Sequence, residues 1–216
     1  MEITWYGHSC FRITERGMAS VVTDPYDPEV VGHDPGKLRA DVVTVSCDKP
    51  AHNHVKAVRG AALEITGPGE YEVGGVFVTG LLIDGKSKKK NPDELRNTIY
   101  VFEYNGLSIV HLGELNNVPS QTEVEGLGEV NIALIPVGGM TSLNAAKAAE
   151  VISLLEPSIV IPMHYGMRES LIKLDPLSKF LKEMGLNEVE TEETIKFTSR
   201  KSLPDEIRVI VLDKRL

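Results

Sequence analysis

One short stretch of the chain combines residue types that could bind a metal ion with one that could take its place. The apolar run at residues 42–45 leads into a polar segment that contains Cys47, Lys49 and His52. Thiolate and imidazole groups bind zinc, whereas a protonated lysine cannot bind a cation and carries a positive charge of its own. Cys47 has a second interpretation, because a cysteine that ends an apolar strand is more often a small buried residue than a ligand. The segment therefore indicates either a reduced metal site or a site organised by charge pairing.

Six further motifs lie in order along the chain. They are Trp5-Tyr6-Gly7-His8-Ser9-Cys10-Phe11, Thr23-Asp24-Pro25, Gly67-Pro68-Gly69-Glu70-Tyr71, His111-Leu112-Gly113-Glu114-Leu115, Ile135-Pro136-Val137-Gly138-Gly139 and Ile161-Pro162-Met163-His164-Tyr165. In this order and spacing they resemble the metallo-β-lactamase superfamily, and in particular a bacterial branch of zinc-dependent hydrolases related to ascorbate-phosphate lactonases. The resemblance implies an α+β fold class, built as a four-layer α/β/β/α sandwich. A shared fold does not fix the reaction.

Compared with the family motif, the segment after residues 42–45 is degenerate. The family carries Ser-His-x-His-x-Asp-His there, and its three His and one Asp hold one or two zinc ions. In this chain Cys47 stands at the first His, Lys49 at the second, Ala51 at the Asp and His52 at the third His. The resemblance therefore implies that most of one metal half-site has been lost.

The resemblance also implies which residues remain to form a site. Four residues are candidate metal ligands: His52, His164, Glu114 and Cys47. Glu114 stands in the place of a bridging Asp, and Cys47 is a secondary candidate. His8 and Asp24 are implied to orient the ligands from behind. The family's extra His has no counterpart in the loop at residues 81–85. We expect at most one zinc or other divalent ion, or none.

Two function classes stay open. The first is a metal-dependent hydrolase in which one ion activates water against a small ester, lactone or phosphodiester, with Glu114 and Lys49 as catalytic candidates. The second is a catalytically inactive ligand-binding or interaction protein, in which Lys49 replaces the metal charge by pairing with Glu114. The replaced ligands favour the second class on chemical grounds, whereas the family resemblance favours the first.

The elements that must position these residues fall into two halves. Runs rich in β-branched and aromatic residues predict strands at residues 2–6, 10–14, 20–23, 42–45, 63–66, 71–73 and 76–79, with one short helix near 53–58. In the second half, predicted strands at 98–104, 107–111, 130–136, 159–163 and 206–212 alternate with helices at 122–127, 144–155 and 174–184. We expect one domain that covers residues 1–216.

Composition narrows the choice of partners. The 216 residues are 42% hydrophobic, which is enough to bury a full core, and the net charge of -8 repels polyphosphate. We therefore expect a small-molecule substrate or ligand, with anionic molecules among the candidates, and no nucleic acid. The sequence shows no export signal and no apolar run of membrane-spanning length, so we expect a cytoplasmic protein with no membrane partner. The lysine-rich stretch 86–93 is interpreted as a solvated loop, with a flap over an anionic substrate as the alternative.

Overall fold

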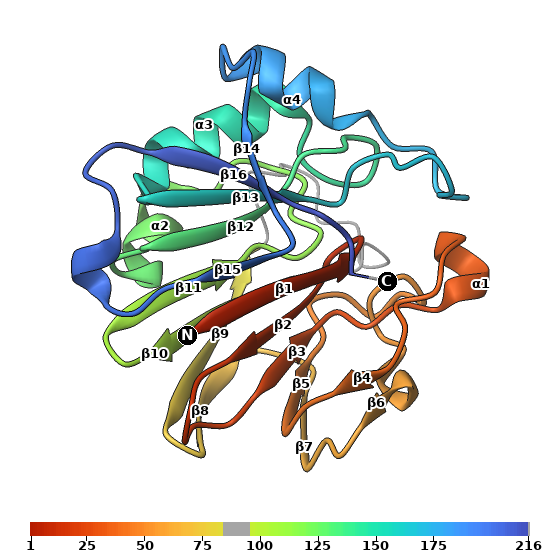
Figure 1. Ribbon diagram of the computed structural model, residues 1–216, viewed down its shortest axis with the longest axis vertical. Coiled ribbons are helices and arrows are strands. Elements are labelled where there is room, and N and C mark those ends of the chain that lie inside the picture. Colours follow the sequence, from red (N-terminus) through yellow and green to blue (C-terminus); the bar gives the residue numbers. More distant parts are fainter. Residues whose placement is uncertain (84–95, 216) are drawn as a thin grey trace.

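The structure is a computed structural model that describes residues 1–83 and 96–215, and it consists of two facing β-sheets with helices outside them (Figure 1). Within these residues the first sheet has six strands in the order β15-β1-β2-β3-β5-β7. They are β1 (Glu2–Gly7), β2 (Cys10–Thr14), β3 (Val21–Thr23), β5 (Val42–Thr44), β7 (Leu63–Ile65) and β15 (Thr194–Lys196). β1, β2 and β3 form the antiparallel meander that the sequence predicts, whereas β3, β5 and β7 run parallel.

The second sheet has eight strands in the described residues, in the order β14-β16-β13-β12-β11-β10-β9-β8. They are β8 (Gly69–Val73), β9 (Val76–Ile83), β10 (Asn97–Tyr104), β11 (Leu107–His111), β12 (Ile132–Pro136), β13 (Ile159–Met163), β14 (Glu190–Glu192) and β16 (Arg208–Leu212). A small parallel pair joins β4 (Leu38–Arg39) and β6 (Val58–Arg59). The helices are α1 (Pro28–Val31), α2 (Gln121–Leu127), α3 (Ala145–Leu155) and α4 (Leu177–Glu183), with 3-10 turns η1 (Val55–Ala57) and η2 (Arg200–Ser202).

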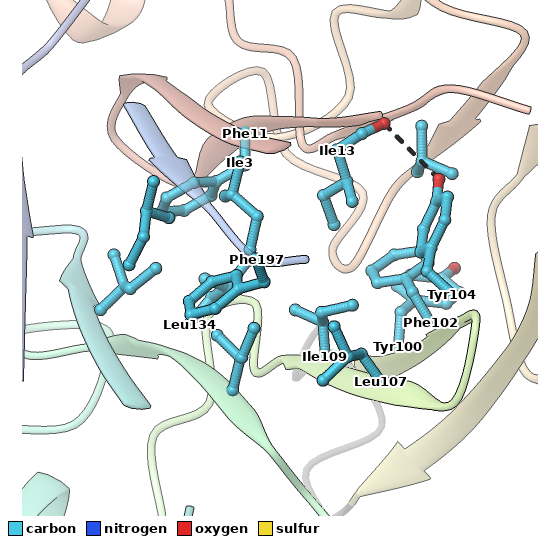
Figure 2. Packing of buried hydrophobic residues seen from close by; sticks show 14 of the residues in the cluster. Ile3, Phe11, Ile13, Tyr100, Phe102, Tyr104, Leu107, Ile109, Leu134 and Phe197 are labelled. Atoms are coloured by element: carbon cyan, nitrogen blue, oxygen red, sulfur yellow. Dashed lines mark hydrogen bonds between the residues drawn. The ribbon is translucent and has the colours of Figure 1, made fainter. Parts of the chain in front are cut away.

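The main core lies between the two sheets. Figure 2 shows Ile3, Phe11 and Ile13 of the first sheet facing Phe102, Ile109 and Leu134 of the second, and all six are fully buried. Burying one such side chain stabilises the fold by about 1.5–3 kcal/mol. Alternate residues of the second sheet point the other way and pack under α2, α3 and α4, as expected for strands covered on both faces.

The outer face of the first sheet has a much thinner cover. Tyr26, Val31 and Leu38 pack there against Val22 and Val43, and in the described residues the helical part of this layer is the single turn of α1 and the 3-10 turn η1. The α+β class and the sandwich architecture are confirmed, with a fourth layer made mostly of loop.

Two of the expected helices differ in the structure. The helix expected near 53–58 is only the three-residue turn η1, because the backbone N–H groups of His52 and Asn53 both donate to Lys49 O in a preceding turn. So short a segment also has too few hydrogen bonds to nucleate a helix. The helix expected at 174–184 begins only at Leu177, since Asp175 precedes Pro176 and its N–H donates to Gly138 O.

Parallel strands bring several loops to one edge of the sandwich. β3 and β5 are parallel neighbours, as are β11, β12 and β13, so the residues that follow them leave the sheets at the strands' carboxyl ends. Ligand sites in proteins with parallel strands gather at this edge. Asp24, His52, Glu114 and His164 all lie in segments that follow these strands.

The described part of the chain contains no helix that is long and apolar enough to cross a membrane. The lysine-rich stretch 86–93, with its two interpretations, lies outside the described residues.

Candidate metal centre

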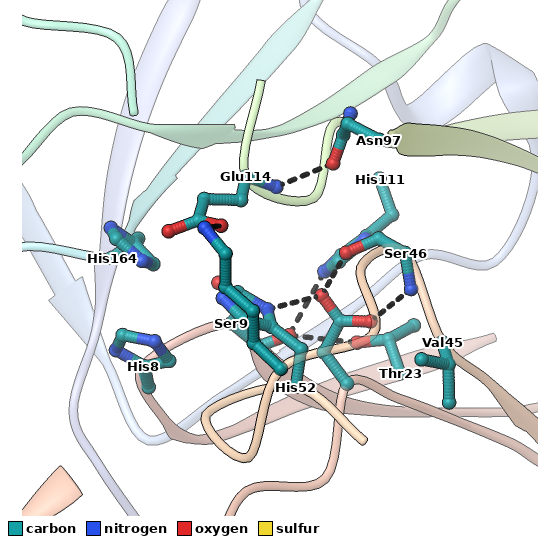
Figure 3. A network of polar contacts seen from close by, with 12 residues as sticks. His8, Ser9, Thr23, Val45, Ser46, His52, Asn97, His111, Glu114 and His164 are labelled. Carbon is teal, nitrogen blue, oxygen red and sulfur yellow. Dashed lines mark hydrogen bonds and ion pairs between the residues drawn. The ribbon is translucent and has the colours of Figure 1, made fainter. Parts of the chain in front are cut away.

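Three histidine side chains meet at the edge where the strands end. His8, His52 and His164 each offer one ring nitrogen, and these atoms lie within 4.8 Å of one another. The ring centroids of His8 and His164 are 4.1 Å apart, and those of His52 and His164 are 5.6 Å apart. All three side chains are buried. Figure 3 shows His8 and His164 facing each other, with Glu114 above His164.

Asp24 orients one of these rings. Nδ1 of His52 donates to Oδ2 of Asp24 at 2.8 Å, and the same carboxylate accepts from the backbone N–H of Ser46 at 2.7 Å and from its hydroxyl. A proton on Nδ1 leaves Nε2 of His52 with a free lone pair, and that atom is buried without a hydrogen-bond partner in the described residues. A carboxylate behind a metal-binding histidine fixes the ring and its tautomer in this way.

His164 is oriented by a hydroxyl group. Ser142 Oγ donates to Gly139 O at 3.2 Å and lies 3.2 Å from Nδ1 of His164. Because that hydroxyl has only one hydrogen, it accepts from Nδ1 in this arrangement. Nε2 of His164 then carries the lone pair, as in His52.

The buried environment keeps the imidazoles of His8 and His164 neutral. Burial, together with the neighbouring His164, His52 and His33, holds the pKa of His8 well below its ordinary value. Burial and His52 lower the pKa of His164 to about 3. Burial would raise the pKa of Asp24, but His111, His52 and the hydrogen bonds from His52 and Ser46 keep it below its ordinary value. The site therefore combines neutral imidazoles at His8 and His164 with an ionised carboxylate at Asp24, and metal binding requires these protonation states.

The donor atoms fit a metal ion. Buried polar atoms nearly always have a partner, yet Nε2 of His8 and Nε2 of His52 have none in the described residues. Two nitrogens on one tetrahedral zinc lie about 3.4 Å apart, given Zn–N bonds of about 2.1 Å, so side-chain movements of about 1 Å would bring the cluster onto one ion. Three neutral histidines with an open fourth position are an established zinc ligand set.

Glu114 has a different set of partners. Its side chain, which is 7% exposed, forms an ion pair with the Lys49 ammonium. Burial would raise the pKa of Glu114, but His52, Lys49 and Thr141 hold it below its ordinary value. The backbone N–H of Glu114 donates to Asn97 Oδ1 at 2.8 Å. The ion pair that the sequence suggested between Lys49 and Glu114 is therefore present.

The structure brings some of the expected ligands together and separates others. His52 and His164 meet, and His8, which the resemblance assigned an orienting role, joins them as a third donor. Among the described residues Glu114 and Cys47 are not part of this group. Cys47 is 4% exposed, and burial and Glu114 raise its pKa to about 12, which disfavours the thiolate that metal binding needs.

His111 lies behind the centre and not in it. Its Nε2 donates to Ser9 O at 2.9 Å, and the side chain is fully buried. The sequence assigned His8 an orienting role. Its place beside His164 as a possible ligand depends on the β1–β2 turn meeting the end of β13, where the N–H of His164 donates to His8 O at 3.0 Å. No local pattern carries that long-range contact.

A cavity of about 720 Å³ is lined by Ser46, Cys47 and Asn53, which neighbour residues of the centre, but by none of the three histidines. Ser46 donates to Asp24. Cys47 lies beside Glu114. The wall of the cavity has apolar, polar and charged parts: Val45, Val55, Pro68 and Leu82, then Asn53, Thr66 and Thr98, then Asp48, Glu64 and Arg96. The volume suits a small organic molecule.

Comparison with known proteins identifies the family. Residues 2–164 match the β-lactamase superfamily domain. The chain belongs to the metallo-β-lactamase superfamily. A solved structure of a superfamily protein from Thermotoga maritima is 33% identical, covers 98% of this chain and 97% of that one, and superposes with a TM-score of 0.78.

Curated relatives extend over similar lengths. A UPF0173 protein of Pyrococcus furiosus is 28% identical over 206 residues, which are 85% of this chain and 90% of that protein. A UPF0173 metal-dependent hydrolase of Thermoplasma acidophilum is 25% identical over 200 residues, with coverage of 82% and 88%. The resemblance inferred from the motifs is confirmed.

Proposed function

We propose that this protein is a metal-dependent hydrolase that uses one divalent ion, such as zinc, held by His8, His52 and His164. Support comes above all from one observation: three buried imidazoles converge, and two of them end in Nε2 atoms that have no partner in the described residues. When bound, the ion would lower the pKa of a water to about 7 and so provide hydroxide near neutral pH.

The residues around the cluster have separate tasks in this proposal. Asp24 holds the His52 proton on Nδ1, and Ser142 holds the His164 proton on Nδ1, so that each Nε2 faces inward. Lys49, whose side chain is 34% exposed, holds a positive charge against Glu114. An ammonium at this place can stabilise the negative charge that develops on the substrate oxygen during hydrolysis. The Lys49–Glu114 pair is thus compatible with a metal, because His8 supplies the third donor that Glu114 does not.

The cavity beside Cys47 supports a small-molecule substrate. A small ester, lactone or phosphodiester would place its apolar part against Val45, Val55 and Leu82. Arg96 can pair with an anionic group, while Asp48 and Glu64 give the wall a mixed character. A compact substrate with one acidic group fits this lining.

Metal content and activity test the proposal together. Purified protein, loaded with zinc and passed through a desalting column, is analysed for bound metal and assayed with p-nitrophenyl acetate, γ-butyrolactone and bis(p-nitrophenyl) phosphate. We expect one zinc per chain, and hydrolysis of at least one of these compounds. His8→Ala, His52→Ala and His164→Ala should each lose metal and activity.

His54→Ala is the matched control, because His54 lies close in the chain to His52 but its side chain is 38% exposed. It should keep both metal and activity. Wild-type protein that takes up no divalent ion, yet binds small anions, would contradict the proposal and indicate a ligand-binding protein instead.

A further inference from the structure

His8 is held differently from the other two histidines. The ring of His52 donates to Asp24 and the ring of His164 lies against Ser142, but Nε2 of His8 has no partner in the described residues. Its carbonyl oxygen accepts from Trp5 Nε1 at 3.1 Å and from the N–H of His164 at 3.0 Å. These two bonds fix the peptide of His8, so the direction of its ring depends on the turn that carries it.

That turn has an unusual backbone. Gly7 has φ 100° and His8 has φ 50°, and the β1–β2 register shifts between Trp5 and Gly7. A non-glycine residue with a positive φ is strained and persists only where its surroundings impose the conformation. The two hydrogen bonds to the His8 carbonyl and contacts on the preceding residues together hold this conformation.

Tyr26 and His33 make those contacts. The hydroxyl of Tyr26 donates to Tyr6 O at 2.6 Å, and Nδ1 of His33 lies 2.7 Å from the same hydroxyl. Tyr26 is fully buried, and its ring meets that of His8 edge-on at 6.1 Å between centroids.

The side chains of Tyr26 and His33 also pack against Gly7. A Cβ atom at Gly7 would lie 2.7 Å from His33 Cε1 and 2.9 Å from the Tyr26 hydroxyl, so the two side chains leave room only for glycine. Gly7 is thus held on its amino side by Tyr26, through the Tyr6 carbonyl, and at its Cα by both side chains.

We propose that Tyr26 and His33 are positioning residues for the metal centre, and that they set the direction of the His8 ring by holding the turn Tyr6–Gly7–His8. The inference rests on the proposed function, since it assigns His8 to the metal. It adds two residues outside the three-histidine cluster, of which Tyr26 meets the His8 ring. Removing such an outer partner typically weakens metal binding about 10- to 100-fold.

The test compares zinc affinity with stability. Zinc dissociation constants are measured by competition with a chromophoric chelator, and the visible absorption of the cobalt(II) form reports the coordination of the ion. Tyr26→Phe removes the hydroxyl alone, and His33→Phe keeps a flat ring beside Gly7 but removes Nδ1. We expect both variants to bind zinc at least tenfold more weakly and to show a weakened cobalt(II) absorption band.

Tyr104→Phe provides a matched control. Tyr104 is also fully buried, and its hydroxyl donates to a backbone oxygen, Ala19 O, at 2.8 Å. This variant should lose similar thermal stability and keep wild-type zinc affinity. Tyr26→Phe that behaves like Tyr104→Phe would overturn the inference and leave Tyr26 a structural residue. If instead wild type takes up neither ion, or His8→Ala binds zinc as well as wild type, the proposed function fails and the positioning role with it.

Discussion

Replacing Asp24 by Asn should separate the stability of the fold from the tautomer of His52. The carboxylate accepts the backbone N–H of Ser46 on Oδ1, and the Ser46 hydroxyl and Nδ1 of His52 on Oδ2. Asparagine keeps one acceptor oxygen and places an NH₂ group where the other oxygen was. The Ser46 hydroxyl can rotate to accept from that group, but His52 can accept only if its proton moves from Nδ1 to Nε2.

The expected magnitudes follow from that exchange. One charge-assisted hydrogen bond in a buried site is lost, which destabilises the apo protein by about 1.5–3 kcal/mol. For a chain of this size, this loss lowers Tm by about 3–12 °C. A proton on Nε2 also removes the lone pair that faces the metal, so zinc affinity should fall about 10- to 100-fold. A carboxylate-to-amide change that imposes the wrong histidine tautomer has this kind of effect in hydrolase triads.

Thermal unfolding of the apo protein and chelator competition for zinc measure the two effects. Asp41→Asn is the control, because Asp41 accepts from the N–H and the hydroxyl of Ser20 at 2.8 and 2.7 Å, but is exposed and contacts no histidine. It should lose little stability and no zinc affinity. An Asp24→Asn protein that unfolds earlier but binds zinc within threefold of wild type would refute the reasoning.

Two further predictions concern charges. Lys49→Met should destabilise the protein by about 1–3 kcal/mol in urea titrations, because it leaves the Glu114 carboxylate buried without its ammonium, and adding Glu114→Gln should recover most of the loss. Additive losses in the double variant would show that the pair does not couple. Burial and Lys214 lower the pKa of His33 to about 4. Between pH 6.5 and 4 the unfolded chain therefore binds a proton that the folded protein does not. Up to about 3 kcal/mol of the unfolding free energy is lost as the pH falls through this range. The His33→Phe variant should lack this part of the acid destabilisation. If its unfolding free energy fell between pH 7 and pH 4 by as much as that of wild type, the role given to His33 would be contradicted.

The sequence was sufficient for the fold and for part of the site. Runs of β-branched residues and ordered motifs predicted β1, β2 and the buried strands β12 and β13, because burial on both faces leaves a continuous apolar pattern. His52 and His164 were found because the motifs that carry them resemble those of the family. β14 and β15 were missed, since they are three-residue strands whose pairing with β16 and β1 is a long-range contact. The single-domain prediction and the roles assigned to Glu114 and Cys47 stay predictions.

Unusual backbone angles also occur at the candidate metal centre. Six non-glycine residues in the described part of the chain have a positive φ: His8, Asp24, Asn105, Met140, Glu156 and His164. Asn105 stands before Gly106 in the turn between β10 and β11, and Glu156 ends α3, so both adopt this conformation for ordinary local reasons.

His8, Asp24 and His164 differ from these in that their side chains belong to the candidate centre, although His8 also opens the two-residue turn between β1 and β2. Each directly follows a strand, at φ 50°, 39° and 52° respectively, and a left-handed backbone costs a residue with a Cβ about 1–2 kcal/mol. Glycine would relieve that strain at each position, but would also delete an imidazole or the carboxylate behind one. Backbone strain of this kind gathers at binding and catalytic sites, so three such positions whose side chains meet in one buried cluster support the proposed centre.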